Sequence, residues 1–169
     1  MLLVENTLDA LQLLAERHRA QYKIPVVGIT GSNGKTVVKE WLSQLLGADF
    51  RVARSPRSYN SQVGVPLSVW QMNEHTDVAL IEAGISRHHE MKRLRPIIRP
   101  TIGVLTNIGG AHQENFSSLQ DKCMEKLSLF RNSDIIIYNG DDEVVCESVN
   151  RTLQSAREIA WSRHNEDKP

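Results

Sequence analysis

Residues 24–36 read Ile-Pro-Val-Val-Gly-Ile-Thr-Gly-Ser-Asn-Gly-Lys-Thr, and the rest of the chain is arranged around them. The first half is a short apolar run rich in β-branched residues, which is typical of a buried strand. The Gly, Ser and Asn residues that follow are typical of a tight turn. After the turn, apolar residues recur at helical spacing, at Val37, Val38, Trp41, Leu42 and Leu45. The stretch therefore predicts a strand, a glycine-rich loop and a helix.

This succession of elements is the layout of a phosphate-binding loop. Gly31 and Gly34 can adopt backbone angles that a Cβ would forbid, so successive N–H groups can converge on phosphate oxygens. The helix N-terminus contributes partial positive charge, Lys35 contributes a full charge, and the Thr36 hydroxyl can bind a magnesium ion. We therefore expect a nucleoside triphosphate to be bound by Gly31, Ser32, Asn33, Gly34, Lys35 and Thr36.

The loop departs at one position from the strict G-x-x-x-x-G-K-[ST] pattern. That pattern places its first glycine at position 29, which is Ile29 here, and Gly28 lies one residue earlier. The alternative interpretation is a glycine turn whose lysine is merely exposed to solvent. The strand before the turn and the helix after it favour the nucleotide site.

Length and charge restrict the classes of protein to consider. The 169 residues predict one domain, and the formal net charge of +0 gives no electrostatic reason to expect a nucleic acid or a membrane partner. No apolar run is long enough to span a bilayer, and the first five residues are too short and acidic for a signal peptide. Cys123 and Cys146 lack the spacing of a metal site, which is typical of reduced cysteines in a cytoplasmic protein.

Apolar strands alternate with amphipathic helices along the chain. We expect a first helix from Asn6 to about Tyr22, with Asn6 as its N-cap. We further expect strands at 50–54, 77–84, 101–108, 134–138 and 158–161, and helices opening at 64–67 and spanning 91–95, 118–130 and 144–154. The helix at 91–95 should end before Pro96. The alternation predicts a three-layer α/β fold, with a mostly parallel sheet and helices on both faces.

Ligands of such sheets lie beyond the carboxyl ends of the strands, where several chemically active residues gather. Glu82 could cap a helix or pair with an arginine, but its place at a strand end favours magnesium binding. Histidine is an unusual magnesium ligand, so the role of His112 stays open. Asp141 and Asp142 are an alternative magnesium-binding pair. Lys126, with charged neighbours on a helix, is by default a solvated charge.

Five motifs together resemble the Mur ligase family in their order and spacing. They are residues 30–36 (Thr-Gly-Ser-Asn-Gly-Lys-Thr), 81–84 (Ile-Glu-Ala-Gly), 107–116 (Asn-Ile-Gly-x-Ala-His-x-Glu-x-Phe), 126–130 (Lys-x-x-Leu-Phe) and 139–142 (Asn-Gly-Asp-Asp). The resemblance implies the P-loop NTPase-like central domain of that family. Residues 60–66, Asn-Ser-Gln-Val-Gly-Val-Pro, are most similar to members that add D-alanyl-D-alanine to UDP-N-acetylmuramoyl-tripeptide, in the form fused to an alanine racemase.

The resemblance also implies ATP and two magnesium ions as cofactors. By this similarity Thr36 and Glu82 hold one ion, and His112 holds the second. Lys126 matches a lysine that is typically carbamylated, and the carbamate would help to position the second ion. Lys35, His112 and Lys126 are then the residues expected to act in catalysis.

The remaining matches concern the nucleotide base and the substrate. Asn139 and Asp141 match a segment beside the adenine and ribose, and Asn60 matches an asparagine near the transferred phosphate and the substrate. Two positions depart from the family pattern: Ala83 stands where a methionine is common, and His89 stands where a glycine is usual.

Family members have an N-terminal domain that holds the UDP portion and a C-terminal domain that closes over ATP. We therefore expect residues 1–169 to be a single central ATP-binding domain that lacks both and does not ligate alone. The expected reaction of the whole enzyme is ATP-dependent amide formation through an acyl phosphate, in cytoplasmic peptidoglycan synthesis. The alternatives are another Mur ligase, a folylpolyglutamate synthase, or a non-catalytic P-loop nucleotide-binding module.

Overall fold

The computed structural model describes residues 3–110 and 113–164, and within them six strands form one sheet in the order β2-β3-β1-β4-β5-β6. The strands are β1 Val26–Thr30, β2 Val52–Arg54, β3 Val78–Glu82, β4 Ile102–Leu105, β5 Ile135–Asn139 and β6 Arg157–Trp161. Every neighbouring pair is parallel. The parallel sheet predicted from the sequence is confirmed.

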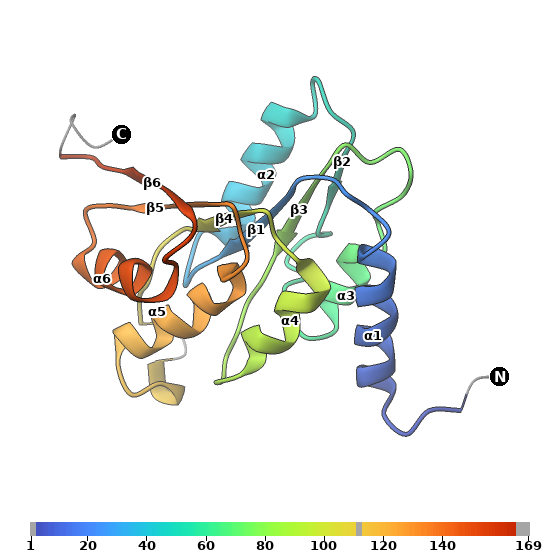
Figure 1. Cartoon of the computed structure of the whole chain (residues 1–169), viewed down its shortest axis with the longest axis horizontal. Helices are drawn as coiled ribbons and strands as arrows, with labels where there is room; N and C mark the ends of the chain where they lie inside the picture. The colour runs from blue at the N-terminus through green and yellow to red at the C-terminus, as the bar shows by residue number, and fades with distance from the viewer. Residues whose placement is uncertain (1–2, 111–112, 165–169) are drawn as a thin grey trace.

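Helices lie on both faces of this sheet (Figure 1). Helix α2, Lys35–Leu46, lies on one face. The opposite face carries α1 Thr7–Arg19, α3 Gly64–Val69, α4 Glu90–Ile98, α5 Leu119–Leu127 and α6 Glu143–Thr152. Two short 3-10 helices, η1 Gln113–Asn115 and η2 Ser128–Phe130, flank α5. The helices and the sheet between them form the three-layer α/β architecture predicted from the sequence.

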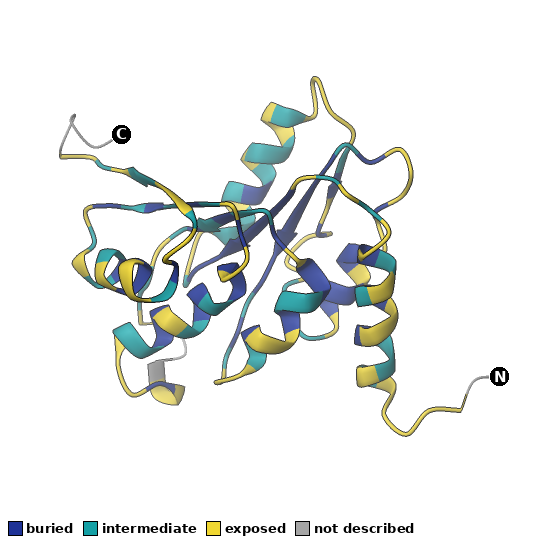
Figure 2. Cartoon of the chain, in the orientation of Figure 1, coloured by how far each residue is buried: buried dark blue, intermediate teal, exposed yellow. Residues whose placement is uncertain are grey.

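The alternation of side chains along β1 divides the interior into two cores. Val27 and Ile29 pack with Val78 and Leu80 beneath α2, whereas Val26 packs into the larger core under the other helices. All five residues of β1 are buried, as expected for a central strand covered on both faces (Figure 2). The burial of β1 fixes the position of the glycine-rich loop that follows it.

Side-chain caps start three of the helices where the sequence changes from polar to amphipathic. Asn6 accepts hydrogen bonds from the N–H groups of Leu8 and Asp9 at the start of α1, as predicted. Ser118 caps α5, and Asp142 caps α6 in the same way. Each cap satisfies N–H groups that the helix itself leaves without acceptors.

Helix α4 continues past Pro96 and ends at Ile98, so the prediction that it stops before the proline is wrong. Proline removes one backbone donor, which normally ends a helix. Here Ile97 and Ile98 are buried in the larger core, and their packing offsets that loss. The chain leaves the helix at Arg99, whose φ of 45° is left-handed.

Helix α2 buries only part of the apolar pattern that predicted it. Val38 and Leu42 pack against the core beneath the helix, whereas Val37, Trp41 and Leu45 are exposed, Trp41 by 64%. The apolar residues of α2 are therefore buried only on the side of the helix that faces the strands.

The structure bears on the expectations about membrane spans and cysteines within the residues that it describes. No helix in that part of the chain combines the length and apolarity that crossing a bilayer requires. Cys123 and Cys146 are both free thiols, and Cys123 is buried.

Gly103 of β4 provides a test of packing in the larger core. A Cβ at this position would lie 2.7 Å from the Phe130 ring and 2.9 Å from Cδ1 of Ile136, both buried. We expect Gly103→Ala to lower the free energy of unfolding by about 1–3 kcal/mol, because the core must shift to admit a methyl group. Urea denaturation measures the change. Gly110→Ala is the control, since its Cβ would meet no atom within 4 Å. Equal stabilities of the two variants would contradict the expectation.

Candidate nucleotide site

The loop between β1 and α2 has the backbone conformation that its glycines were expected to permit. Gly31 has φ 149° and Gly34 has φ 78°, both in the region that favours glycine. A Cβ on Gly31 would lie 2.0 Å from Oγ1 of Thr106, so a larger residue does not fit. Gly34 is the N-cap of α2, and the first N–H groups of a helix lack intrahelical acceptors. The loop thus ends at a helix terminus suited to an anion.

The loop after β4 holds the phosphate loop in place. The N–H of Ser32 donates to the carbonyl of Asn107 at 2.9 Å, and the N–H of Asn33 donates to Oδ1 of Asn107 at 3.0 Å. Thr106 Oγ1 donates to the carbonyl of Asn33 at 2.6 Å, and the N–H of Gly109 donates to Ser32 Oγ at 2.9 Å. Ser32 and Asn33 therefore use these N–H groups to fix the loop, and their contact with a nucleotide stays a prediction.

Glu82 is a buried carboxylate, 1% exposed, at the end of β3. Thr36 Oγ1 donates to its Oε2 at 2.9 Å, and Asn60 Nδ2 donates to its Oε1 at 2.7 Å. The ammonium of Lys39 lies 3.7 Å from Oε2. These donors offset the penalty of burying a charge. The alternatives of a helix cap or an arginine partner for Glu82 find no support among the described residues.

The pair formed by Glu82 and Thr36 fits a magnesium ion shared with phosphates. Mg²⁺ prefers oxygen ligands and binds through one or two carboxylates together with phosphates and water, rather than in an all-protein cage. Within the described residues, no group of three or more His, Cys, Asp or Glu could hold a metal ion. Phosphate oxygens of a nucleotide and water molecules are the ligands that would complete the coordination of such an ion. His112, expected to hold the second ion, lies outside the described residues.

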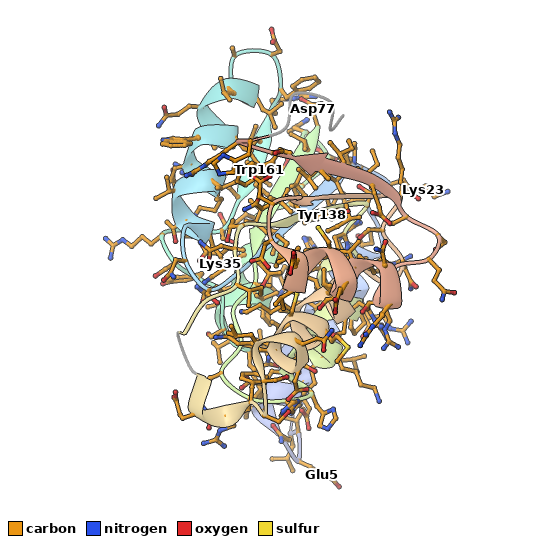
Figure 3. All side chains as sticks on the ribbon, turned by 90° about the vertical axis from the view of Figure 1, so that its left-hand side faces the viewer. Glu5, Lys23, Lys35, Asp77, Tyr138 and Trp161 are labelled. Atoms are coloured by element: carbon orange, nitrogen blue, oxygen red, sulfur yellow. The ribbon has the colours of Figure 1, made fainter. Side chains whose placement is uncertain are left out.

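Three lysine ammonium groups converge on the loops at this edge. Lys35 Nζ donates to the carbonyl of Gly31 at 3.0 Å, and Lys126 Nζ donates to the same carbonyl at 3.1 Å. Lys122 Nζ donates to the carbonyl of Gly109. Figure 3 shows Lys35 at the first turn of α2, far from Asp77 at the opposite end of the sheet. The interpretation of Lys126 as a solvated charge is wrong, because its side chain is 3% exposed.

Burial and mutual repulsion both disfavour these positive charges. Burial is the main cause that lowers the pKa of Lys126 to about 7, and the charges of Lys35 and Lys122 lower it further. Burial also lowers the pKa of Lys35, although Glu82 opposes that shift. A bound polyanion would offset both penalties, so the lysine cluster suits a triphosphate.

A cavity of about 310 Å³ opens beside the lysine cluster. It brings together the loop residues with Asn60 and Glu90, which come from segments far apart in the sequence. Its lining consists of Gly31, Ser32, Lys35, Asn60, Ser61, Gln62, Val63, Gly84, Ile85, Ser86, Glu90 and Lys126. Asn60 therefore lines a cavity together with residues of the phosphate loop, and its contact with a substrate stays a prediction.

The segment after β5 lies at the same edge, but its side chains accept hydrogen bonds from backbone N–H groups of the chain itself. Oδ1 of Asn139 accepts from the N–H of Asp141 at 3.0 Å, and Oδ2 of Asp141 accepts from the N–H of Arg163 at 2.7 Å. Asp142 accepts from the N–H of Val145 as the cap of α6. The alternative magnesium pair is therefore not supported, since Asp142 has a capping role. Contact of Asn139 and Asp141 with a nucleotide stays a prediction.

Sequence reasoning missed two buried lysines. Lys39 is 0% exposed and contacts Glu82, and Lys122 is 1% exposed and contacts the loop at Gly109. The available signal for Lys39 was its place in the helix one residue after Val38, which packs against the core, and one turn after Lys35. Nothing comparable in the sequence marks Lys122, which donates to the carbonyl of Gly109, 13 residues earlier.

Comparison with known proteins settles the family. Residues 29–168 match the Mur ligase middle domain. The chain belongs to the Mur ligase family. It is 34% identical over 148 residues to the UDP-N-acetylmuramoyl-tripeptide–D-alanyl-D-alanine ligase of Bacillus subtilis (strain 168), covering 86% of this chain and 32% of the relative. The ligase of that name from Rickettsia prowazekii (strain Madrid E) is 36% identical over 145 residues, covering 84% and 32%.

Solved structures of Mur ligases agree with the fold. MurF from Acinetobacter baumannii superposes with a TM-score of 0.88 at 26% identity, covering 94% of this chain and 36% of that one. MurF ligase from Thermotoga maritima in complex with ADP gives a TM-score of 0.86 at 29% identity, covering 97% and 38%. The chain spans about a third of the length of the curated relatives it matches.

One of the two positions that depart from the expected family pattern has an unusual backbone conformation. His89 has φ 65° and is the N-cap of α4. This left-handed conformation favours glycine, the residue that the family resemblance leads us to expect at this position. The residue after it, Glu90, accepts from the N–H groups of Ser86 and Arg87 at 2.7 and 2.9 Å. These two hydrogen bonds stabilise the turn in which His89 adopts its left-handed conformation.

The buried ammonium of Lys126 predicts a pH-dependent stability. Its pKa is about 7 in the folded chain against an ordinary 10.5, so the unfolded chain binds more protons between these values and wild-type stability rises with pH. We expect Lys126→Met to be more stable than wild type below pH 7, with an advantage that shrinks toward pH 10 by roughly 1.4 kcal/mol per pH unit at most. Urea denaturation at several pH values measures this. Exposed Lys92→Met is the control, and an advantage independent of pH would contradict the assignment.

Proposed function

We propose that this chain is the ATP-binding domain of a ligase that joins D-alanyl-D-alanine to UDP-N-acetylmuramoyl-tripeptide in peptidoglycan precursor synthesis. The observation that carries the proposal is the meeting of the Thr36–Glu82 pair with Lys35 and Lys126 at one loop. The substrates are inferred from the names of the relatives at 34% and 36% identity. Because the reaction consumes ATP and nucleotide-linked precursors, we propose a cytoplasmic location for the ligase.

The proposed chemistry needs positive charge and alignment more than a protein nucleophile. A carboxylate oxygen of the tripeptide attacks the γ-phosphorus of ATP, ADP leaves, and an acyl phosphate forms. The amine of the dipeptide then attacks the acyl carbon, phosphate leaves, and the nitrogen loses a proton. Both steps bring anionic groups together, so cations, helix N-termini and fixed donors lower the barrier. Bound Mg²⁺ would supply further neutralisation of the phosphates.

Individual residues take roles that match their surroundings. Lys35 would offset charge on the β- and γ-phosphates, and Thr36 with Glu82 would hold one of two magnesium ions. Asn60 lines the cavity, where it would contact the substrate or the transferred phosphate. His112 would hold the second ion together with a carbamate on Lys126.

The environment of Lys126 supports carbamylation. Carbamylation requires the neutral amine, and a pKa of about 7 leaves a large fraction of Lys126 neutral near pH 7. The neutral nitrogen would attack the carbon of CO₂, form an N–C bond and release a proton. The resulting anion would lie near Lys35 and Lys122, whose positive charges favour it.

The complete protein is proposed to carry the other parts of such an enzyme. Its relatives are about three times as long as this chain. We propose that the complete protein includes the UDP-binding and C-terminal domains of the family, and an alanine racemase region. The reading frame on either side of this chain tests the proposal directly.

Two other functions remain to be separated from this one. Folylpolyglutamate synthases share the fold, with a TM-score of 0.68 at 16% identity for the structure titled "apo form of L. casei FPGS", covering 96% of this chain and 52% of that one. That likeness supports the fold alone. A nucleotide-binding module without catalysis would also use Lys126 for the phosphates, so acceptor-dependent phosphate release is what separates it from a ligase. The assays below distinguish all three.

The acceptor specificity of the complete protein tests the proposed reaction. With ATP, Mg²⁺ and UDP-N-acetylmuramoyl-tripeptide, we expect phosphate release to require D-alanyl-D-alanine, and single amino acids or glutamate to be poor acceptors. Lys35→Ala should lower kcat/KM by roughly 100-fold, because charge on the phosphates loses its partner. Lys23→Ala is the control, since this exposed lysine points away from the protein (Figure 3). Equal phosphate release with another acceptor would reject the proposal. So would the absence of phosphate release when D-alanyl-D-alanine is supplied.

A second test concerns the carbamate. We expect Lys126→Ala in the complete protein to lose most of its activity, because the anion beside the second ion is gone. Formate or acetate should restore part of the activity by occupying the vacated place. Lys92→Ala, at an exposed position, should neither lose activity nor respond to carboxylates. Full activity of Lys126→Ala, or failure of every short carboxylate to rescue it, would remove the carbamate from the proposal.

A further inference from the structure

Lys39 is a buried cation whose place is not explained by the phosphate-binding loop alone. Its side chain is 0% exposed, although it lies on a helix that borders solvent. Buried lysines are rare and need partners that compensate for the loss of water. The identity of those partners indicates what the residue does.

The ammonium of Lys39 joins three segments that are separate in the sequence. Nζ donates to the carbonyl of Ser55 at 2.8 Å and to the carbonyl of Arg57, both in the segment after β2. It lies 3.7 Å from Oε2 of Glu82 at the end of β3, and 3.3 Å from Oε1 of Glu40 on its own helix. Lys39 therefore connects α2, residues 55–57 and the buried carboxylate.

The segment from Ser55 to Asn60 is also attached to β3 at each of its ends. At one end, the N–H of Glu82 donates to Ser55 Oγ at 3.1 Å. At the other, the N–H of Gly84 donates to the carbonyl of Asn60 at 2.8 Å, and Asn60 Nδ2 donates to Oε1 of Glu82 at 2.7 Å. Lys39 binds the first half of the segment, through the carbonyls of Ser55 and Arg57.

We propose that Lys39 is a positioning residue, which holds residues 55–60 against the end of β3 so that Glu82 and Asn60 keep a fixed orientation toward a magnesium–nucleotide complex. Its charge also offsets the burial of the Glu82 carboxylate. The inference rests on the proposed nucleotide site. It adds a residue that touches neither the nucleotide nor the ion and acts through Glu82 and Asn60.

The variant Lys39→Met tests this role, because methionine has a similar length but cannot donate to the carbonyls of Ser55 and Arg57. The probe is ADP bound to the 169-residue chain, measured by titration calorimetry with Mg²⁺ and again with EDTA. We expect the tightening of ADP binding by Mg²⁺ to fall about tenfold, the effect typical of losing a residue that orients a metal ligand. Binding in EDTA should stay within about twofold. A merely structural residue would weaken both measurements equally, and that result would overturn the proposal.

A double-mutant comparison asks whether Lys39 acts through Glu82. Glu82→Gln alone should remove most of the tightening by Mg²⁺, and adding Lys39→Met should change it no further. If the two substitutions instead reduced the Mg²⁺ effect independently, so that their fold-losses multiplied in the double variant, Lys39 would not act through Glu82 and the proposal would be overturned. Lys23→Met is the matched control, an exposed lysine whose replacement should leave both binding constants unchanged.

Hydrogen exchange without nucleotide or metal gives a second readout. In Lys39→Met, the amides of Asn60 and Gly84 should exchange faster, whereas the amides of β5 should not change. Unchanged exchange at Asn60 and Gly84 would overturn the proposal even if ADP does not bind. If wild type fails to bind ADP, the proposed function fails and exchange still decides the role of Lys39. Should Lys39→Met not fold, Ser55→Ala removes the Oγ link to Glu82 and should show a smaller loss of the Mg²⁺ effect in the same assay.

Discussion

The carboxylate of Glu82 is the group on which the site depends. A buried charge without partners would oppose folding strongly, so its burial at the end of β3 requires donors. Thr36 and Asn60 supply hydrogen bonds to its two oxygens, and Lys39 supplies charge at 3.7 Å. These donors come from helix α2 and from the segment after β2. Satisfying this one carboxylate therefore fixes the relative positions of helix α2, the segment after β2 and the strand end.

Parallel strand order makes this convergence possible. Because β1 lies between β3 and β4, the loop after β1 meets Glu82 on one side and the loop after β4 on the other. Asn107 and Gly109 then bind the backbone and side chain of Ser32. The glycine-rich loop is thus held from both neighbouring strands before any ligand binds. Such preorganisation leaves little ordering to be done by a nucleotide.

The sequence was sufficient for the features that depend on local pattern. Alternating apolar runs predicted the parallel sheet, and the Gly31 and Gly34 positions predicted a loop with unusual backbone angles. It failed where distant contacts decide. Lys126 looks solvated among charged neighbours, yet it reaches Gly31, 95 residues away. Pro96 was read as a helix end because local rules could not count the burial of Ile97 and Ile98.

The lysine cluster shows how stability and function are connected in this fold. Lys35 and Lys126 both donate to the carbonyl of Gly31, in surroundings that lower the pKa of each. Holding these positive charges together opposes folding, and Glu82 offsets only part of the penalty at Lys35. A bound polyanion removes the repulsion and stabilises the folded state by mass action. The same electrostatics that oppose folding of the domain would therefore favour an anionic ligand at this edge of the sheet.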